Sequence, residues 1–163
     1  MNDSFNVAGK LKLELKDSSG NIVDNREVPN LVVASGKEHI ASRVARIVGP
    51  SGTFSANLEA NGNISAVMNC MALGGDSTAV VVGDDELKKE MGRQGFSSTT
   101  RTTSAISYIS VFGPGLATGT IKEAGVFNQN VANFGNMLCR TTFSDLTKGG
   151  SDSLTVTWVI TIL

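Results

Sequence analysis

The chain has 163 residues, which suits a single domain with a substantial hydrophobic core, because a chain near this size buries roughly 68–70% of its unfolded surface. Charged residues make up 18% of the sequence, below the usual figure of about 25%, and this favours a surface that is partly buried against other subunits. The net charge is −1 and the basic residues are scattered, so we expect no nucleic-acid partner, which would require clustered Lys and Arg.

Targeting and membrane-spanning segments are not recognisable. The first ten residues, MNDSFNVAGK, contain neither a basic segment nor an apolar run. No apolar stretch approaches the roughly 20 residues that cross a bilayer. We therefore expect a protein that is made and used in soluble form and has no membrane partner.

The first predicted element is a β-hairpin that follows a short arm. We expect residues 1–9 to form a flexible arm in which Phe5 and Val7 contact a partner. From residue 10 to residue 16, leucines alternate with charged residues, which is typical of a half-buried antiparallel strand. The turn sequence DSSGN follows, and a second strand begins at Ile22.

One helix is predicted, over about residues 35–48. Ser35 and Glu38 have the S-x-x-E spacing of a capping box, and Gly49-Pro50 ends the apolar periodicity. The only histidine, His39, lies in this helix. We expect it to face solvent or to act as a cap, because nothing nearby in the sequence suggests a catalytic partner.

The rest of the chain is rich in β-prone segments joined by Gly- and Asn-rich loops. The clearest is 153–163, where large apolar residues face one side and threonines face the other. Long strands, short turns and one helix imply a mainly β fold, an antiparallel β-sandwich or jelly-roll-like barrel, with residues 10–163 forming one domain. The other predicted strands are 67–73, 99–112, 118–127 and 137–143, and the second of these is expected to bend near residues 105–107.

The stretch MALGGDSTAVVVGDDELKKEMGR, residues 71–93, combines a strand end, a turn and an acidic cluster. One interpretation is a loop that presents carboxylates to a hard cation such as calcium. The other is a structural connection, in which glycines turn the backbone and the acids start a short helical turn. We favour the second, in which Asp84 and Asp85 at most contact a neighbouring subunit. The candidate calcium ligands are Asp76, Asp84, Asp85 and Glu86.

Motifs of catalysis are missing from the sequence. It contains no GxxxxGK[ST], no GxSxG and no HExxH, and a single histidine nearly excludes nucleophilic triads and multi-histidine metal sites. The two cysteines, Cys70 and Cys139, lack CxxC spacing and are expected to be buried thiols. We therefore predict a protein that is not an enzyme and uses no cofactor or metal ion.

Two charged residues stand in apolar segments where a core strand would prefer none. Glu123 lies between Ile121 and Val126, and Arg140 follows Met-Leu-Cys. Because an unpartnered buried charge is costly, we predict that Glu123 pairs with Arg140 or with Arg93. The alternative is a solvated pair at a strand edge.

Four segments in order resemble a known family. They are ALGGDSTAVVVGDDELKKEMGR, GTIKEAGVFN, NMLCRTTF and SLTVTWVITIL, and the pattern extends over roughly residues 31–163. This order resembles small virion structural proteins of tailed bacteriophages. The resemblance implies a non-enzymatic, β-rich and usually oligomeric particle component, of the capsid cement or decoration, head-fibre base or tail-associated type.

Two classes of function are therefore expected. The leading one is a capsid cement or decoration protein, a homotrimer or homodimer that binds the major capsid protein or other virion proteins and stabilises the assembled head. It would reside in the virion and be assembled in the host cytoplasm, and a tail, collar or fibre-base protein is the alternative. The second class is a carbohydrate-binding β-sandwich, although one Trp and one Tyr leave few rings for sugar stacking.

Overall fold

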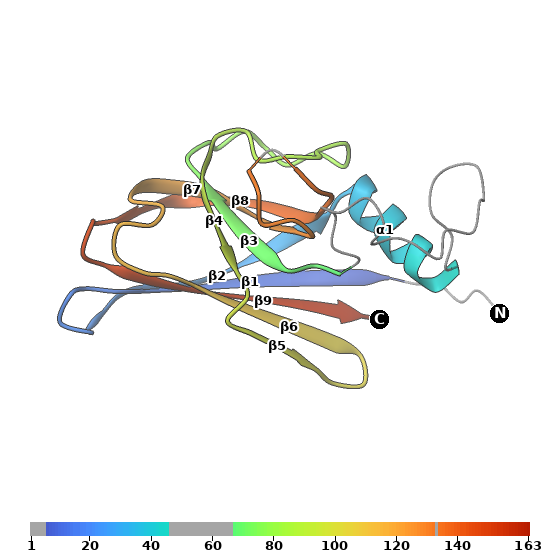
Figure 1. Ribbon diagram of the computed structural model, residues 1–163, viewed down its shortest axis with the longest axis horizontal. Coiled ribbons are helices and arrows are strands. Elements are labelled where there is room, and N and C mark those ends of the chain that lie inside the picture. Colours follow the sequence, from blue (N-terminus) through green and yellow to red (C-terminus); the bar gives the residue numbers. More distant parts are fainter. Residues whose placement is uncertain (1–5, 46–66, 133) are drawn as a thin grey trace.

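The computed structural model describes residues 6–45, 67–132 and 134–163, which form nine strands and one helix (Figure 1). All strand pairs are antiparallel, so the expected mainly β fold with one short helix is confirmed. In chain order the elements are β1 (Val7–Lys16), β2 (Ile22–Val32), α1 (Ala34–Ala45), β3 (Cys70–Gly74), β4 (Glu90–Gly95), β5 (Ser98–Arg101), β6 (Ala105–Phe112), β7 (Gly119–Phe127), β8 (Met137–Lys148) and β9 (Ser153–Ile162).

The strands make one curled sheet in the order β4-β3-β7-β8-β2-β1-β9-β6-β5. Strand β2 pairs with β1 along most of its length but with β8 only through Leu31 and Val32. The sheet therefore bends at β2. We call β3, β4, β7 and β8 the upper half and β1, β2, β5, β6 and β9 the lower half, following their places in Figure 1.

The two edge strands of the sheet are neighbours in the sequence. Strand β4 ends at Gly95 and β5 begins at Ser98, so Phe96 and Ser97 carry the chain from the upper half to the lower half. The Ser97 amide donates to the Ile109 carbonyl at 2.7 Å. The Ser110 hydroxyl of β6 lies 3.3 Å from the Gln94 and Gly95 carbonyls of β4. The sheet is thus curled so that edge strand β4 contacts β6, the neighbour of the other edge strand β5.

The main hydrophobic core lies between the two halves. Leu11, Leu13 and Trp158 of the lower half are 0% exposed and share one apolar cluster with Met71 and Ile121 of the upper half. The alternation that predicted the first and last strands therefore places their apolar sides in this core. The predicted bend in 99–112 is instead a hairpin, because residues 102–104 form the turn between β5 and β6.

A second, smaller apolar cluster lies on the outer side of the upper half. Cys70 and Ala72 alternate along β3 with Met71 and Leu73 of the main core, so this strand is buried on both faces. Its outer face is covered by the chain itself, as the next subsection describes. The cluster comprises Val33, Cys70, Ala72, Leu87, Phe127 and Met137.

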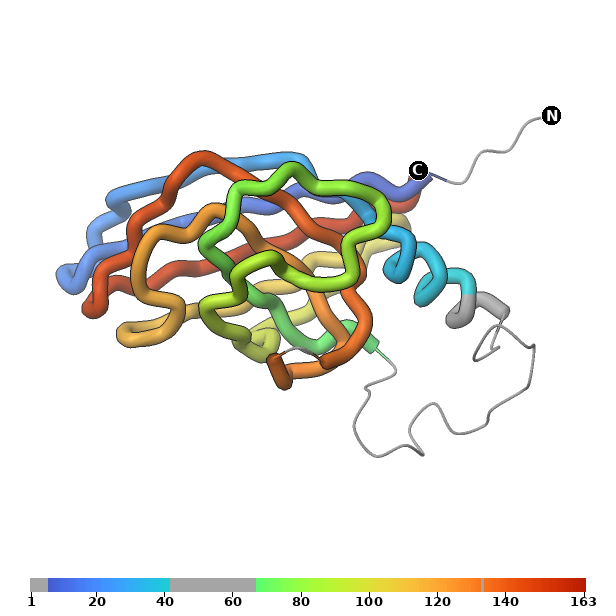
Figure 2. The backbone as a smooth tube through the Cα atoms, turned by 90° about the horizontal axis from the view of Figure 1, so that it is seen from above, coloured from blue at the N-terminus to red at the C-terminus, as the bar shows by residue number. Residues whose placement is uncertain are grey.

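Helix α1 packs against β8 at one end of the molecule (Figure 2). The predicted capping box is wrong, because Ser35 lies inside the helix and its hydroxyl donates to the Met137 carbonyl at 2.9 Å. Gly36 permits this contact, since a Cβ there would lie only 2.0 Å from the Leu138 carbonyl oxygen. The predicted continuation of the helix from residue 46 to residue 48 lies outside the described residues.

The predicted flexible arm overlaps the first strand. Strand β1 begins at Val7, which is paired with Ile162, and Asn6 and Leu163 exchange two backbone hydrogen bonds of 3.3 and 2.8 Å. The long β9 provides pairing partners that the sequence pattern did not reveal. Val7 packs against the main core and so is not part of a free arm, while Phe5 lies outside the described residues.

Candidate functional site

Two loops lie on the outer face of the upper half (Figures 1 and 2). Loop 75–89 joins β3 to β4, and loop 128–136 joins β7 to β8. Leu87 of the first loop belongs to the outer apolar cluster together with Phe127 and Met137. The side chain of one buried arginine also contacts each loop, Arg140 for loop 75–89 and Arg93 for loop 128–136.

Glycines in the strands let loop 75–89 approach the sheet closely. A Cβ at Gly74 would lie 2.5 Å from Glu123 Oε1 and 2.7 Å from the Lys89 carbonyl oxygen. A Cβ at Gly125 would lie 2.9 Å from the Phe127 ring and 3.1 Å from a Leu87 methyl carbon. Any larger residue at either position would push the loop or its neighbours away.

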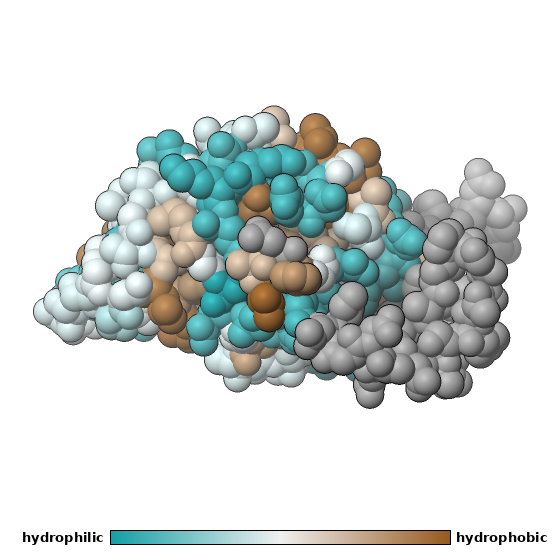
Figure 3. All heavy atoms as spheres, turned by 45° about the horizontal axis from the view of Figure 1, so that its top comes forward, coloured by the Kyte–Doolittle hydropathy of each residue, from teal (hydrophilic) through white to brown (hydrophobic). Residues whose placement is uncertain are grey.

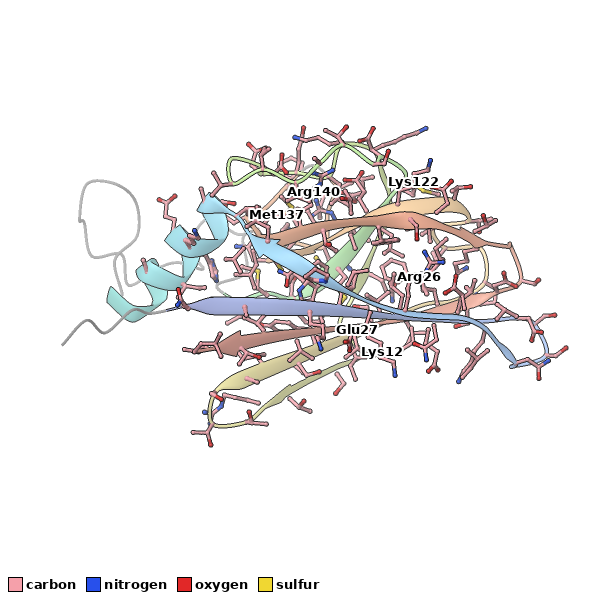
Figure 4. The ribbon with its side chains drawn as sticks, turned by 180° about the vertical axis from the view of Figure 1, so that it is seen from behind. Lys12, Arg26, Glu27, Lys122, Met137 and Arg140 are labelled. Atoms are coloured by element: carbon pink, nitrogen blue, oxygen red, sulfur yellow. The ribbon has the colours of Figure 1, made fainter. Side chains whose placement is uncertain are left out.

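Arg140, on β8, holds loop 75–89 (Figure 4). Its Nε and Nη2 atoms lie 2.9 and 2.8 Å from Glu123 Oε2, and its Nη1 atom lies 2.9 Å from Asp84 Oδ2. Nη2 also donates to the Thr78 carbonyl at 3.1 Å. The Arg140 side chain is 0% exposed, so one guanidinium joins β8, β7 and the loop within the protein interior.

The two carboxylates around Arg140 are fully hydrogen-bonded. Glu123 accepts from the amides of Lys88 and Lys89 at 3.1 and 2.8 Å. Asp84 accepts from the Val81 amide at 3.0 Å and pairs with Lys88 Nζ at 2.9 Å. Burial favours a higher pKa for the Asp84 carboxyl, but the hydrogen bonds from Val81, Lys88 and Arg140 outweigh it and lower that pKa. The cluster is therefore a satisfied structural network.

The predicted partner of Glu123 is confirmed for Arg140, whereas Arg93 pairs with Glu90 instead. The partner contact predicted for Asp84 is wrong, because this residue is 2% exposed and turned inward by Arg140. Asp85 is exposed, and its partner contact stays a prediction.

The calcium interpretation of the acidic cluster is not supported. Asp84 is engaged by cations of the chain itself, and Asp76 Oδ1 accepts from the Thr78 amide at 2.6 Å. In the part of the chain that the structure describes, no three metal-ligating side chains lie together in a way that suits a metal ion. The favoured structural interpretation is wrong in one detail, since residues 84–89 contain a bend and a turn but no helix.

Arg93, on β4, holds loop 128–136. Its side chain is 5% exposed, and its Nε atom lies 2.8 and 3.0 Å from the two carboxylate oxygens of Glu90. Nη1 donates to the carbonyls of Gln129 and Phe134 at 2.7 and 2.9 Å, which fixes both ends of the loop. The guanidinium also lies 3.8 Å from the centre of the Phe127 ring.

The prediction of two buried thiols is confirmed. The Cys70 thiol, on β3, donates to the Gln129 carbonyl at 3.1 Å, and burial raises its pKa to about 11. Burial likewise raises the pKa of Cys139, which belongs to the main core. The two residues lie on opposite faces of the upper half.

No family model, curated protein or solved structure matches the chain. Within the described residues, no helix has the length and apolarity needed to cross a membrane. The function is therefore inferred from the geometry of the loop-covered face and from the sequence pattern.

Both loops carry exposed apolar side chains. Val81 and Val82 of loop 75–89 are 57% and 53% exposed, and Val131 and Phe134 of loop 128–136 are 49% and 64% exposed. We call these four residues the apolar tips. Figure 3 shows the loop-covered face, where hydrophobic groups stand among hydrophilic ones. A groove of about 540 Å³ lies between the loops, and its charged lining includes Glu86, Lys88, Glu90 and Arg93.

Part of this arrangement was not predicted from the sequence. The spacing of three residues between Glu90 and Arg93 could have indicated their ion pair, because oppositely charged residues at this spacing pair on helices. Here the two residues lie in a strand. The run of valines at residues 80–82 was a signal for an apolar loop tip. Nothing local indicated that Asp84 would reach Arg140, because only the folded sheet brings them together.

Proposed function

We propose that this protein is a structural component of a bacteriophage virion, and first of all a capsid cement or decoration protein that binds and stabilises the assembled head as a homo-oligomer. A tail, collar or fibre-base protein is the alternative within the particle. Both proposals assign it a binding role without catalysis. The sequence pattern over roughly residues 31–163 suggests the particle, and the loop-covered face suggests how it binds.

The observation that carries a binding role is the pair of anchored loops with their apolar tips. Exposed valine and phenylalanine side chains remain in contact with water, so several of them on the two loops of one face indicate a site where a partner can bury them. The arginines beneath the loops fix the backbone that carries these side chains. A preformed surface loses little conformational entropy on binding, and therefore binds more tightly than a mobile loop of the same composition.

The proposed mechanism is stabilisation by mass action. A protein that binds the assembled shell but not its separated subunits adds its binding free energy to that of the shell. The groove between the loops contains both acidic and basic side chains, which suits a protein partner of mixed charge better than a polyanion.

We further propose that this mainly β fold is an antiparallel β-sandwich. The upper and lower halves are its two layers, and the bend in β2 and the crossing at Phe96 and Ser97 are its two sides. A jelly-roll order of strands is less compatible, because most sequence neighbours in the lower half pair as hairpins.

No observation favours the carbohydrate-binding alternative. The only tryptophan, Trp158, is 0% exposed, and the only tyrosine, Tyr108, is 8% exposed and stacks on Phe96 with ring centres 4.6 Å apart. Neither ring is placed to stack on a sugar.

Co-sedimentation with purified phage heads and with isolated tails tests the proposal. We expect the wild-type protein to sediment with heads, and the double variant Val81→Ser, Phe134→Ser to bind at least about tenfold more weakly, because each change removes apolar contact area. The matched control is Ile22→Ser, since Ile22 is 54% exposed on the β1–β2 hairpin. Binding to tails alone would establish the alternative, and binding to neither particle would overturn the proposal.

A further inference from the structure

The outer face of the lower half differs from that of the upper half. In Figure 1 the loops lie over the upper half, while strands β6, β9 and β1 of the lower half have none across their outer side. Their outward side chains are half-exposed or exposed, for example Thr157, Ile109 and Lys12. Among the described residues, this face therefore remains available to a partner.

Strand register identifies the side chains at its centre. Along β9, Val156 and Trp158 point into the core, so the residues between and beside them point outward. Three outward residues of β9 pair with three of β6, and together they form a grid without a single charge. We call this grid the neutral patch, and it consists of Thr155, Thr157, Val159, Ser107, Ile109 and Val111.

The margin of this face on the side of β1 and β2 is charged, whereas the opposite margin on β5 presents Ser98 and Thr100. On β1, Lys10, Lys12 and Glu14 are paired with Val159, Thr157 and Thr155 of the patch. Glu27 of β2 is paired with Lys12, beside which it lies in Figure 4, and its carboxylate is 2.7 Å from Lys10 Nζ. A solvent-facing sheet normally carries charged and polar residues across its whole width. An uncharged centre between a charged margin on one side and a polar margin on the other is instead the composition of a protein–protein interface, whose core is depleted of charge and whose rim is polar.

The size and charge of the face favour a second copy of this chain as the partner. Neighbouring strands lie about 4.8 Å apart, and a strand rises about 3.3 Å per residue. These dimensions give the five-stranded face an area of roughly 600–800 Å². A stable interface buries about 800 Å² on each partner. In a twofold contact the same surface of each copy faces the other. Because the margin on β1 and β2 carries both positive and negative side chains, Lys12 of one copy can meet Glu14 or Glu27 of the other.

We propose that the outer face of the lower half, with the neutral patch at its centre, is the self-association surface of this protein, packed face to face against the same face of a second copy around a twofold axis. This inference deepens the homo-oligomeric part of the proposed function by naming its surface. Short β-branched and hydroxyl side chains suit the approximately 10 Å spacing of two packed sheets. The apolar tips lie on the opposite half and stay free for another partner.

Sedimentation equilibrium over a wide concentration range tests the inference on the purified protein alone. We expect a mass twice that of the 17.0 kDa chain, and at least about tenfold weaker dimerisation for Thr157→Lys, which places like charges at the centre of the contact. The control is Thr147→Lys, because Thr147 is an exposed strand residue of the upper half. A wild type that stays monomeric, or a Thr157→Lys variant that associates like wild type, overturns the inference.

A second variant covers the case in which Thr157→Lys does not fold. Both native cysteines are buried, so Thr157→Cys supplies a single accessible thiol. A short bis-maleimide should link two copies of Thr157→Cys but not two copies of Thr147→Cys, and equal linkage of both variants contradicts the assignment. Neither measurement involves phage particles. A failure to bind heads or tails therefore leaves the dimer result standing, and the reverse also holds.

Discussion

Arg140 and Asp84 are 56 positions apart in the sequence, yet Nη1 of the arginine lies 2.9 Å from Oδ2 of the aspartate. Their side chains are 0% and 1% exposed. With Glu123 as the second anion, the guanidinium provides the contact through which loop 75–89 is fixed to the sheet. The apolar tip formed by Val81 and Val82 depends on this contact for its position.

Replacing Arg140 by alanine should destabilise the protein by about 3–5 kcal/mol, because two buried carboxylates lose their shared cation. Urea denaturation followed by circular dichroism measures the change. The control Lys37→Ala removes an exposed cation and should change the stability by less than about 0.5 kcal/mol. Equal stability of Arg140→Ala and wild type would contradict the role given to this network.

The stability should fall in acid, partly through Asp84. The pKa of this carboxyl is lowered from 3.8 in the folded protein, so its stabilising contribution is present above that value and is lost as the pH falls through the folded pKa. Asp84→Asn should therefore be less stable than wild type at neutral pH and show a flatter decline below about pH 5. Denaturation curves at several pH values measure this, with exposed Ser77→Ala, which removes no titrating group, as the control.

Gly36→Ala should destabilise the protein by about 1–3 kcal/mol through overpacking, although alanine favours a helix more than glycine does. The reason is the backbone of β8, since the new Cβ would lie 2.0 Å from the Leu138 carbonyl oxygen. Gly83→Ala is the control, because no atom lies within 4 Å of a Cβ there. Thermal melts of the two variants measure the difference, and a Gly36→Ala variant as stable as Gly83→Ala would argue against the close packing of α1 on β8.

Neither cysteine of the folded protein should react with a thiol reagent at pH 8. Burial excludes the reagent, and the raised pKa of Cys70, about 11, leaves almost no thiolate. Both should react once the chain is unfolded in urea. Ser77→Cys provides an exposed thiol for comparison and should react at once. A native thiol that reacts as fast as this variant would show that the upper half opens readily.

The sequence predicted the parts of the fold that depend on local pattern. Leucines that alternate with charges identified β1, and alternation with threonines identified β9. The Glu123–Arg140 pair was predictable because each charge stands in an apolar segment and needs a partner. These inferences required no knowledge of how the strands are ordered.

The parts that were missed depend on tertiary contacts. Strand β4, EMGRQG, has two glycines and two charges and becomes a strand only because β3 is beside it. Ser35 leaves its expected capping role because the Met137 carbonyl is within reach of its hydroxyl. Asp84 looks like a surface acid in the sequence, and only the position of Arg140 turns it inward.

The crossing at Phe96 and Ser97 affects how the protein unfolds. With β2 continuous at one side and this two-residue connection at the other, the upper and lower halves form a closed belt of polypeptide around the main core. The two halves cannot separate as rigid bodies without breaking the pairing of β4 or β5. Unfolding of either layer therefore unfolds the other. We expect the described strands to melt in a single cooperative transition.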